Sequence, residues 1–226
     1  MIPNETLLLL IRINYKQYKQ RNKLIRKIYY TSIYPFLFLI AIWLVRLYCY
    51  HFNVDMTSFG IHPRNLFGLL GIFIGPFVHS DYSHLLANCF PLFMFGLILC
   101  HFYRPIALRI FLWIYIITGF WVWVAARNAY HIGASGIVYG LACFLFFSGI
   151  FRRDTRLLAI SMLVTFAYGS LVWGVLPITE SVSWESHLFG SIAGCIVAFY
   201  FKAEGPTPQK YDLDDEEEII NLSPEA

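Results

Sequence analysis

Charged side chains are scarce in this sequence. Only 14% of the 226 residues are Asp, Glu, Lys or Arg, whereas 58% are hydrophobic and 19% are aromatic. A soluble domain carries roughly a quarter charged residues, because its surface faces water. The composition therefore excludes an ordinary soluble domain. We expect the lipid bilayer to surround most of this chain. Nucleic acid is not expected as a partner.

Metal-binding patterns are also missing. The five cysteines fall in or at the ends of apolar stretches, without the paired spacing of zinc sites, and are predicted to be small packing residues. His79, His84 and His187 could in principle hold zinc, but no HExxH-type helix supplies ligands and a base. A metalloprotease is therefore the least favoured interpretation, and no metal or other cofactor is expected. The cysteines are Cys49, Cys89, Cys100, Cys143 and Cys195.

A cleavable leader is not recognisable either. The apolar patch at residues 7–11 is too short for a signal-peptide core, and basic residues follow it instead of a cleavage site. Residues 1–30 are predicted to form a basic cytoplasmic segment, with a helix over 5–30 that lies on the membrane surface and attracts anionic headgroups. Residues 203–226 are predicted to be an acidic, disordered cytoplasmic tail.

Six apolar stretches are long enough to cross a bilayer, for which about 20 residues suffice. Positive charge gathers in the cytoplasmic segments of multi-spanning proteins, and here the connections on the opposite side contain only Arg64 and Arg127 of the 17 basic residues. We therefore predict an all-α membrane protein, with six transmembrane helices over residues 31–202 and both termini in the cytoplasm. The predicted spans are 31–50, 82–101, 106–126, 134–151, 157–176 and 187–202.

Polar residues gather at the start of the second, fourth and sixth spans. With both termini in the cytoplasm, these three starts lie together at the outer side of the membrane. His84 and Asn88 are four residues apart and share a helix face, as do Ser135 and Tyr139, while His187 opens the sixth span. Such groups need partners in lipid, and so they mark a candidate functional site.

Small residues predict how two of these helices pack. Gly136 and Gly140 lie in the fourth span, and Gly190 and Gly194 lie in the sixth. Such pairs of small residues, four positions apart, allow membrane helices to approach closely. The approach would bring the serine of the fourth span within hydrogen-bonding reach of the histidine of the sixth.

The chemistry of these groups is that of an activated hydroxyl. Histidine can take the proton of a neighbouring serine, which makes the serine a nucleophile. No Asp or Glu occurs within the predicted fourth or sixth span, so Tyr139 and packing are expected to orient the His187 ring. The Ser135 backbone N–H, the Asn88 amide and His84 are candidate donors to an oxyanion, where one donor is worth about 3–4 kcal/mol in soluble hydrolases.

Each of these residues alone has an ordinary structural explanation. Serine and glycine are common where membrane helices pack, and a histidine near a helix end is commonly interfacial. His79 is interpreted as structural, positioning the loop after Pro76. The combination on three separate spans at one depth is what favours an active site.

At these residues the chain resembles the rhomboid family of intramembrane serine proteases, and the resemblance covers residues 31–202. The family signature combines a GxSG serine that opens the fourth helix, a histidine followed by GxxxG in the sixth, and an HxxxN pair in the second. The corresponding residues here are Gly133-Ala134-Ser135-Gly136, His187 with Gly190 and Gly194, and His84 with Asn88.

The resemblance implies a six-helix bundle with an outward-facing, water-filled cavity, in which Ser135 and His187 form a dyad and Tyr139 packs on the histidine ring. His84 and Asn88 would help to stabilise the oxyanion. The implied substrates are transmembrane helices, cut near the outer membrane boundary by a serine endopeptidase that needs no cofactor. The implied location is a bacterial plasma membrane, with the site facing outward.

Two loops of the family also have counterparts. Residues 52–81 correspond to its interfacial loop, and residues 177–185 to the mobile cap over the site. The Trp-Arg pair often found in the first loop is absent, with Pro63-Arg64 as the nearby basic element, and Ser186 stands where alanine is frequent. These departures leave loop packing and substrate preference open.

Two other functions stay open. A catalytically inactive rhomboid-like protein would bind membrane helices without cutting them, although such proteins usually lack the serine or the histidine that this chain keeps. A small transporter or channel would also need a polar cavity, but the spans show no inverted repeat and the polar residues line one side only.

Overall fold

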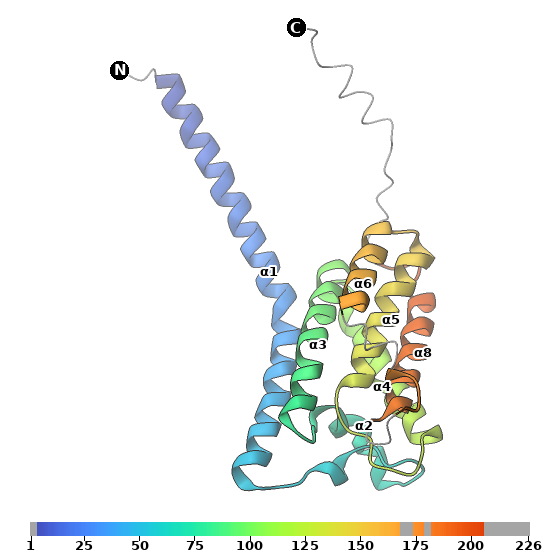
Figure 1. The fold of residues 1–226 in the computed structure, drawn as a ribbon. Coiled ribbons are helices and arrows are strands. Elements are labelled where there is room, and N and C mark those ends of the chain that lie inside the picture. The colour runs from blue at the N-terminus through green and yellow to red at the C-terminus, as the bar shows by residue number, and fades with distance from the viewer. Residues whose placement is uncertain (1–3, 168–173, 179–181, 206–226) are drawn as a thin grey trace.

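The computed structural model describes residues 4–167, 174–178 and 182–205. Within these ranges the regular elements are helices, and an isolated β-bridge pairs Ile61 with His131. Figure 1 shows the helices running side by side as a bundle. The all-α class is therefore confirmed for the described residues.

The helices after the first loop begin and end within three residues of the predicted spans. The exception is the fifth span, of which residues 168–173 lie outside the described residues. Glycine and proline mark most of the breaks between the helices, as expected from their backbone geometry. The helices are α3 (Tyr82–Phe102), α4 (Ala107–Ala125), α5 (Ser135–Arg152), α6 (Thr155–Ala167) and α8 (Trp184–Tyr200).

Four segments of the described chain are long and apolar enough to cross a membrane: Thr31–Phe52, α3, α4 and α5. Large apolar side chains such as Leu44 and Phe90 are more than 50% exposed on the outer faces of these helices. A surface of this kind suits hydrocarbon and not water, so the chain is a membrane protein. Six crossings, and the orientation of the termini, stay predictions.

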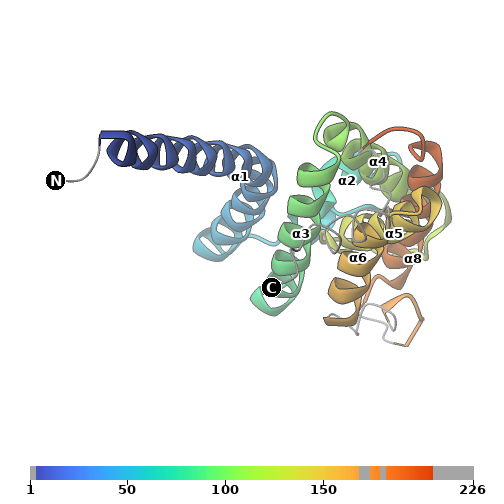
Figure 2. The same cartoon turned by 90° about the horizontal axis from the view of Figure 1, so that it is seen from above.

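The first helix, α1 (Asn4–Phe52), is about 74 Å long at the usual helical rise. Its N-terminal part extends away from the bundle, and Figures 1 and 2 show that it changes direction near its middle. Pro35 lies inside this helix and removes one of its backbone hydrogen bonds, which is a common cause of a bend. The expected boundary between residues 30 and 31 therefore lies inside a continuous helix. Its placement on the membrane surface stays a prediction.

Helix α5 is the centre of the bundle. It packs against α3, α4, α6 and α8, and 67% of the residues in its apolar span are buried. The buried side chains of α5 join one core with those of α3 and α4. The position of the start of α5 is therefore fixed by its packing against several helices.

The loop between α1 and α3 folds into short helical turns and docks on the end of α4. The turns are η1 (Thr57–Phe59), η2 (Phe67–Leu69), α2 (Gly71–Ile74) and η3 (Gly75–Phe77). The Arg64 guanidinium donates to the carbonyl oxygens of Val124 (3.3 Å) and Ala126 (2.9 Å), and the Trp123 indole donates to the Asn65 carbonyl at 2.8 Å. Arg64 thus satisfies carbonyl groups at the C-terminal end of α4.

Candidate active site

The three polar clusters lie at one end of the bundle. Helices α3, α5 and α8 all begin there, while α4 runs in the opposite direction (Figure 1). Ser135 is the first residue of α5, His187 lies in the first turn of α8, and His84 lies in the first turn of α3. Residues more than 100 positions apart in the sequence therefore share one small region.

The turn before Ser135 depends on glycine. Gly133 has a φ of +96°, which a residue with a side chain rarely adopts. Its N–H donates to the Gly75 carbonyl at 2.9 Å, so the first loop holds this turn. Ser135 then opens α5 and is half-buried. Its backbone N–H is one of the first N–H groups of the helix, which have no partner within the helix.

Helices α5 and α8 touch through their glycines. A methyl group added at Gly190 would lie 2.1 Å from the Gly136 carbonyl oxygen, and one added at Gly194 would lie 2.1 Å from the Gly140 carbonyl oxygen. A methyl group at Gly136 would lie 3.0 Å from the carbonyl oxygen of Ser186. The chain neighbours of Ser135 and His187 are therefore in contact, because no side chain separates the backbones.

The His187 ring is held from two directions. It stacks on Tyr139 with ring centres 4.2 Å apart and an angle of 7° between the planes. Its Nδ1 lies 2.7 Å from the Gly174 carbonyl oxygen. A carbonyl oxygen can only accept, so Nδ1 carries the proton and the neutral ring keeps its lone pair on Nε2. That tautomer is the one a general base requires.

Gly174 was not foreseen as a site residue. It lies in the predicted fifth span, where a glycine reads as a packing residue, and a backbone carbonyl leaves no signal in a sequence. A methyl group at Gly174 would lie 1.9 Å from the Tyr139 hydroxyl oxygen. The glycine therefore allows the backbone to reach the stacked pair of rings.

No hydrogen bond joins Ser135 to His187 in the described structure. Both residues lie in the first turns of touching helices. Catalytic hydrogen bonds without substrate are commonly long and shorten when substrate binds.

The HxxxN pair faces the serine turn from α3. A methyl group at Gly133 would lie 2.7 Å from Nε2 of His84, so this ring covers the turn. The Asn88 amide is buried and donates to the His84 carbonyl at 2.9 Å. Asp81 caps α3 by accepting from the His84 backbone N–H at 2.8 Å, and this bond, followed by one from Ser80, holds the pKa of Asp81 below its usual value.

His79 lies behind His84, with ring centres 4.9 Å apart. It is 5% exposed and its Nδ1 lies 3.3 Å from the Phe77 carbonyl oxygen. Burial, with a smaller effect from His84, lowers the pKa of His79 to about 4. His79 is therefore neutral at pH 7 and bonds within the loop that follows Pro76. Its structural role stays a prediction.

A chain of hydrogen bonds joins the segment before Ser135 to the segment before His187. His131 Nε2 donates to the Arg127 carbonyl at 3.1 Å, which leaves His131 Nδ1 to accept from the Ser183 hydroxyl at 2.6 Å. The Ser183 oxygen then lies 2.6 Å from the hydroxyl of Ser186. Burial lowers the pKa of His131, which favours the neutral ring that this pattern needs.

Ser186 therefore has a partner that explains why it replaces the usual alanine. The same segment contains Glu185, which is 3% exposed and lies 3.5 Å from the Arg127 guanidinium. The predicted sixth span, residues 187–202, contains no acidic residue, but α8 begins three residues earlier, at Trp184, and so includes Glu185. Its carboxylate pairs with Arg127, while Tyr139 and Gly174 contact the His187 ring.

A metal is not favoured by the arrangement of side chains. The described residues contain no group of three His, Cys, Asp or Glu side chains that could hold an ion. The five cysteines are free; Cys49 is buried and the other four are half-buried. The sequence predicts them to be small packing residues, and none of the five is exposed.

Comparison with known proteins places most of the bundle in one family. The profile described as the Rhomboid domain matches residues 66–204, which contain every candidate residue discussed above. Uncharacterized proteins of Mycobacterium tuberculosis and Mycobacterium bovis are each 32% identical over 157 residues, which is 64% of this chain and 64% of the relative. An uncharacterized protein of Mycobacterium leprae is 31% identical over 176 residues, or 74% of this chain and 69% of that protein. The matched region thus spans less than two thirds of the first two relatives.

Proposed function

This chain belongs to the rhomboid family, and from that premise we propose that it is an intramembrane serine endopeptidase with Ser135 as nucleophile and His187 as general base. The observation that carries the proposal is the fixed His187 ring. Tyr139 stacks on it and the Gly174 carbonyl binds its Nδ1, so the lone pair of Nε2 remains to take a proton. The glycine contact of α5 with α8 supports the pairing.

In the proposed reaction the Ser135 hydroxyl oxygen attacks the carbonyl carbon of the scissile bond, and its proton passes to Nε2 of His187. The tetrahedral oxyanion accepts from the Ser135 N–H and from the second N–H of the Asn88 amide. His84 donates a further hydrogen bond to the oxyanion when both of its ring nitrogens carry protons. The leaving amine takes the proton from His187, and water then hydrolyses the acyl-enzyme.

The proposed substrates are transmembrane helices of other proteins. A peptide bond inside a helix is shielded, so cleavage needs a segment that unwinds near the outer boundary of the membrane. We place six crossings in residues 31–202, both termini in the cytoplasm, and the site at the outer face of a bacterial plasma membrane. Residues 1–30 and 203–226 lie outside the proposed catalytic domain.

The first experiment needs no known substrate. The purified protein in detergent is treated with a serine-directed fluorophosphonate probe, alongside Ser135→Ala and His187→Ala. We expect labelling of the wild type alone. Ser83→Ala is the matched control, because Ser83 is an exposed serine at the same end of the bundle.

An unlabelled wild type with a normal thermal unfolding transition would reject the proposal. It would favour the alternative of a catalytically inactive rhomboid-like protein that binds membrane helices. Labelling that survives Ser135→Ala would move the nucleophile to another residue.

A further inference from the structure

A cavity lies between α1, α3 and α4. It has a volume of about 530 Å³, and Leu141 of α5 contributes to its lining. This volume lies within the range of sites that hold small molecules, roughly 300–1,000 Å³. We call this cavity the α1 groove.

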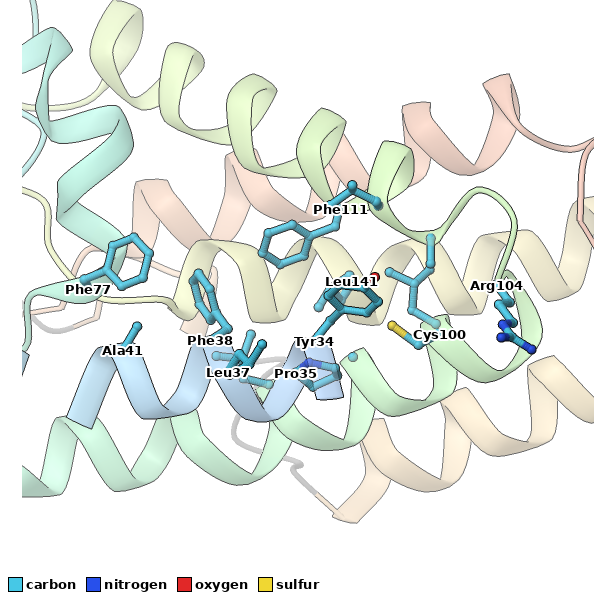
Figure 3. Close-up of a pocket in the computed structure, with 15 residues that line it drawn as sticks. Tyr34, Pro35, Leu37, Phe38, Ala41, Phe77, Cys100, Arg104, Phe111 and Leu141 are labelled. Atoms are coloured by element: carbon cyan, nitrogen blue, oxygen red, sulfur yellow. The ribbon is translucent and has the colours of Figure 1, made fainter. Parts of the chain in front are cut away.

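The walls of the α1 groove are apolar almost throughout. Figure 3 shows Phe77 and Phe38 at one end, and Cys100 followed by Arg104 at the other. The Phe38 ring packs against Phe77 and Phe111, with ring centres 4.9 Å and 5.5 Å apart, so aromatic rings surround this end of the groove. A polar ligand would find no partners along these walls.

The other end of the groove carries a positive charge. Arg104 lies in the turn between Phe102, where α3 ends, and Ala107, where α4 begins, and it is exposed. In a membrane-spanning bundle this turn lies at the level of the headgroups. The groove therefore offers a hydrocarbon environment that ends in a cation at the membrane surface.

We propose that the α1 groove binds one phospholipid with an anionic headgroup. An acyl chain lies along the apolar walls, and the phosphate meets Arg104. Charge complementarity decides the class of lipid, since a basic residue near a membrane surface favours anionic over zwitterionic headgroups by about 1 kcal/mol, which is about fivefold in affinity.

The test is native mass spectrometry of the full chain released from detergent after addition of phosphatidylglycerol or phosphatidylcholine with the same acyl chains. We expect the wild type to retain phosphatidylglycerol about fivefold more strongly. Arg104→Gln should abolish this preference. Arg153→Gln is the matched control, because Arg153 is exposed at the same end of the bundle and does not line the groove.

A second pair of variants tests the apolar walls. Ala41→Trp fills the groove from α1 and should reduce retention of both lipids, whereas Leu44→Trp, on an exposed face of the same helix outside the groove, should not. If Ala41→Trp fails to fold, Leu108→Trp fills the groove from α4. Thermal unfolding checks folding of each variant.

Equal retention of the two lipids by the wild type would overturn the proposal, as would a preference that survives Arg104→Gln. A wild-type dimer that dissociates in Ala41→Trp would assign the groove to a second copy of the chain and would overturn it too. None of these results depends on proteolytic activity.

Discussion

The two faces of the bundle differ in how much room they leave between helices. Where α8 meets α5, a methyl group at Gly190 would lie 2.1 Å from a backbone oxygen, whereas one at Gly96 on the α1 side would lie 2.9 Å from a ring carbon of Pro35. Only 17% of the residues in the apolar span of α1 are buried, against 67% for α5. The backbones are in contact where two candidate catalytic residues must be held together. The α1 side is open and retains a groove.

The largest expected effect comes from removing either of the two proposed catalytic side chains at the closely packed contact of α5 with α8. Ser135→Ala and His187→Ala should each lower cleavage of a transmembrane reporter peptide by about a thousandfold or more, because no other group takes over the attack or the proton transfer. Unfolding temperatures should stay near the wild-type value. Activity retained in either variant would contradict the proposed dyad.

A matched pair of glycine substitutions compares the two faces directly. Gly190→Ala should destabilise the protein by about 3 kcal/mol, because the added carbon meets backbone that cannot move aside. Gly96→Ala should cost about 1 kcal/mol, because the Pro35 ring can shift with α1. Denaturation in detergent gives both values, and equal costs would show that the two faces do not differ in rigidity.

Acid should weaken the region behind His84. The folded-state pKa of His79 is about 4, below the usual 6.5, so protonation favours the unfolded state. The stability that neutral His79 contributes is complete above about pH 6.5 and is lost between pH 6.5 and 4, by up to about 1.4 kcal/mol per pH unit. Unfolding temperatures measured from pH 8 to 4 should fall less steeply in His79→Gln. If the unfolding temperatures of the wild type and of His79→Gln fell in parallel with pH, His79 would not be the origin of the acid sensitivity.

The ion pair at the N-terminal end of α8 should matter less. Glu185→Gln keeps the shape of the side chain and removes the charge that faces Arg127, at a cost of about 1 kcal/mol because Arg127 is partly exposed. Cleavage should fall severalfold as the segment before His187 loosens. Asp55→Asn, in the exposed part of the first loop, is the control and should change neither value.

The smallest effect is expected from the flanks. Removal of residues 1–30, or of residues 206–226, should leave cleavage within about twofold of the wild type, because neither segment contributes to the proposed site. A large loss of activity in a folded truncation would place part of the catalytic domain outside residues 31–202.

Much of the candidate site could be found from residue spacing. His84 and Asn88, or Ser135 and Tyr139, share a helix face because four residues make about one turn. The starts of α3, α5 and α8 share one end because the chain reverses direction at each connection. The start of α8 was predicted three residues late, because the charged Glu185 interrupts the apolar pattern by which a span is recognised.

Other features depend on segments that are distant in sequence. The Gly174 carbonyl reaches His187 from another part of the chain, and nothing in a glycine predicts where its oxygen points. The bond from His131 to Ser183 crosses 52 positions. Arg64 reaches the end of α4 across about 60. Each was invisible until packing brought the partners together.

The sequence by itself determined that the chain is a helical membrane protein. It also determined that Ser135, His187, His84 and Asn88 lie at the same end of the helices, because hydrophobicity and helical spacing are local properties of the chain. Only the tertiary structure decided which atom holds the His187 ring, why Ser186 is polar, and that a groove with Arg104 at its end remains beside α1. Those features arise from the distances between separate helices, which depend on the packing of the whole bundle.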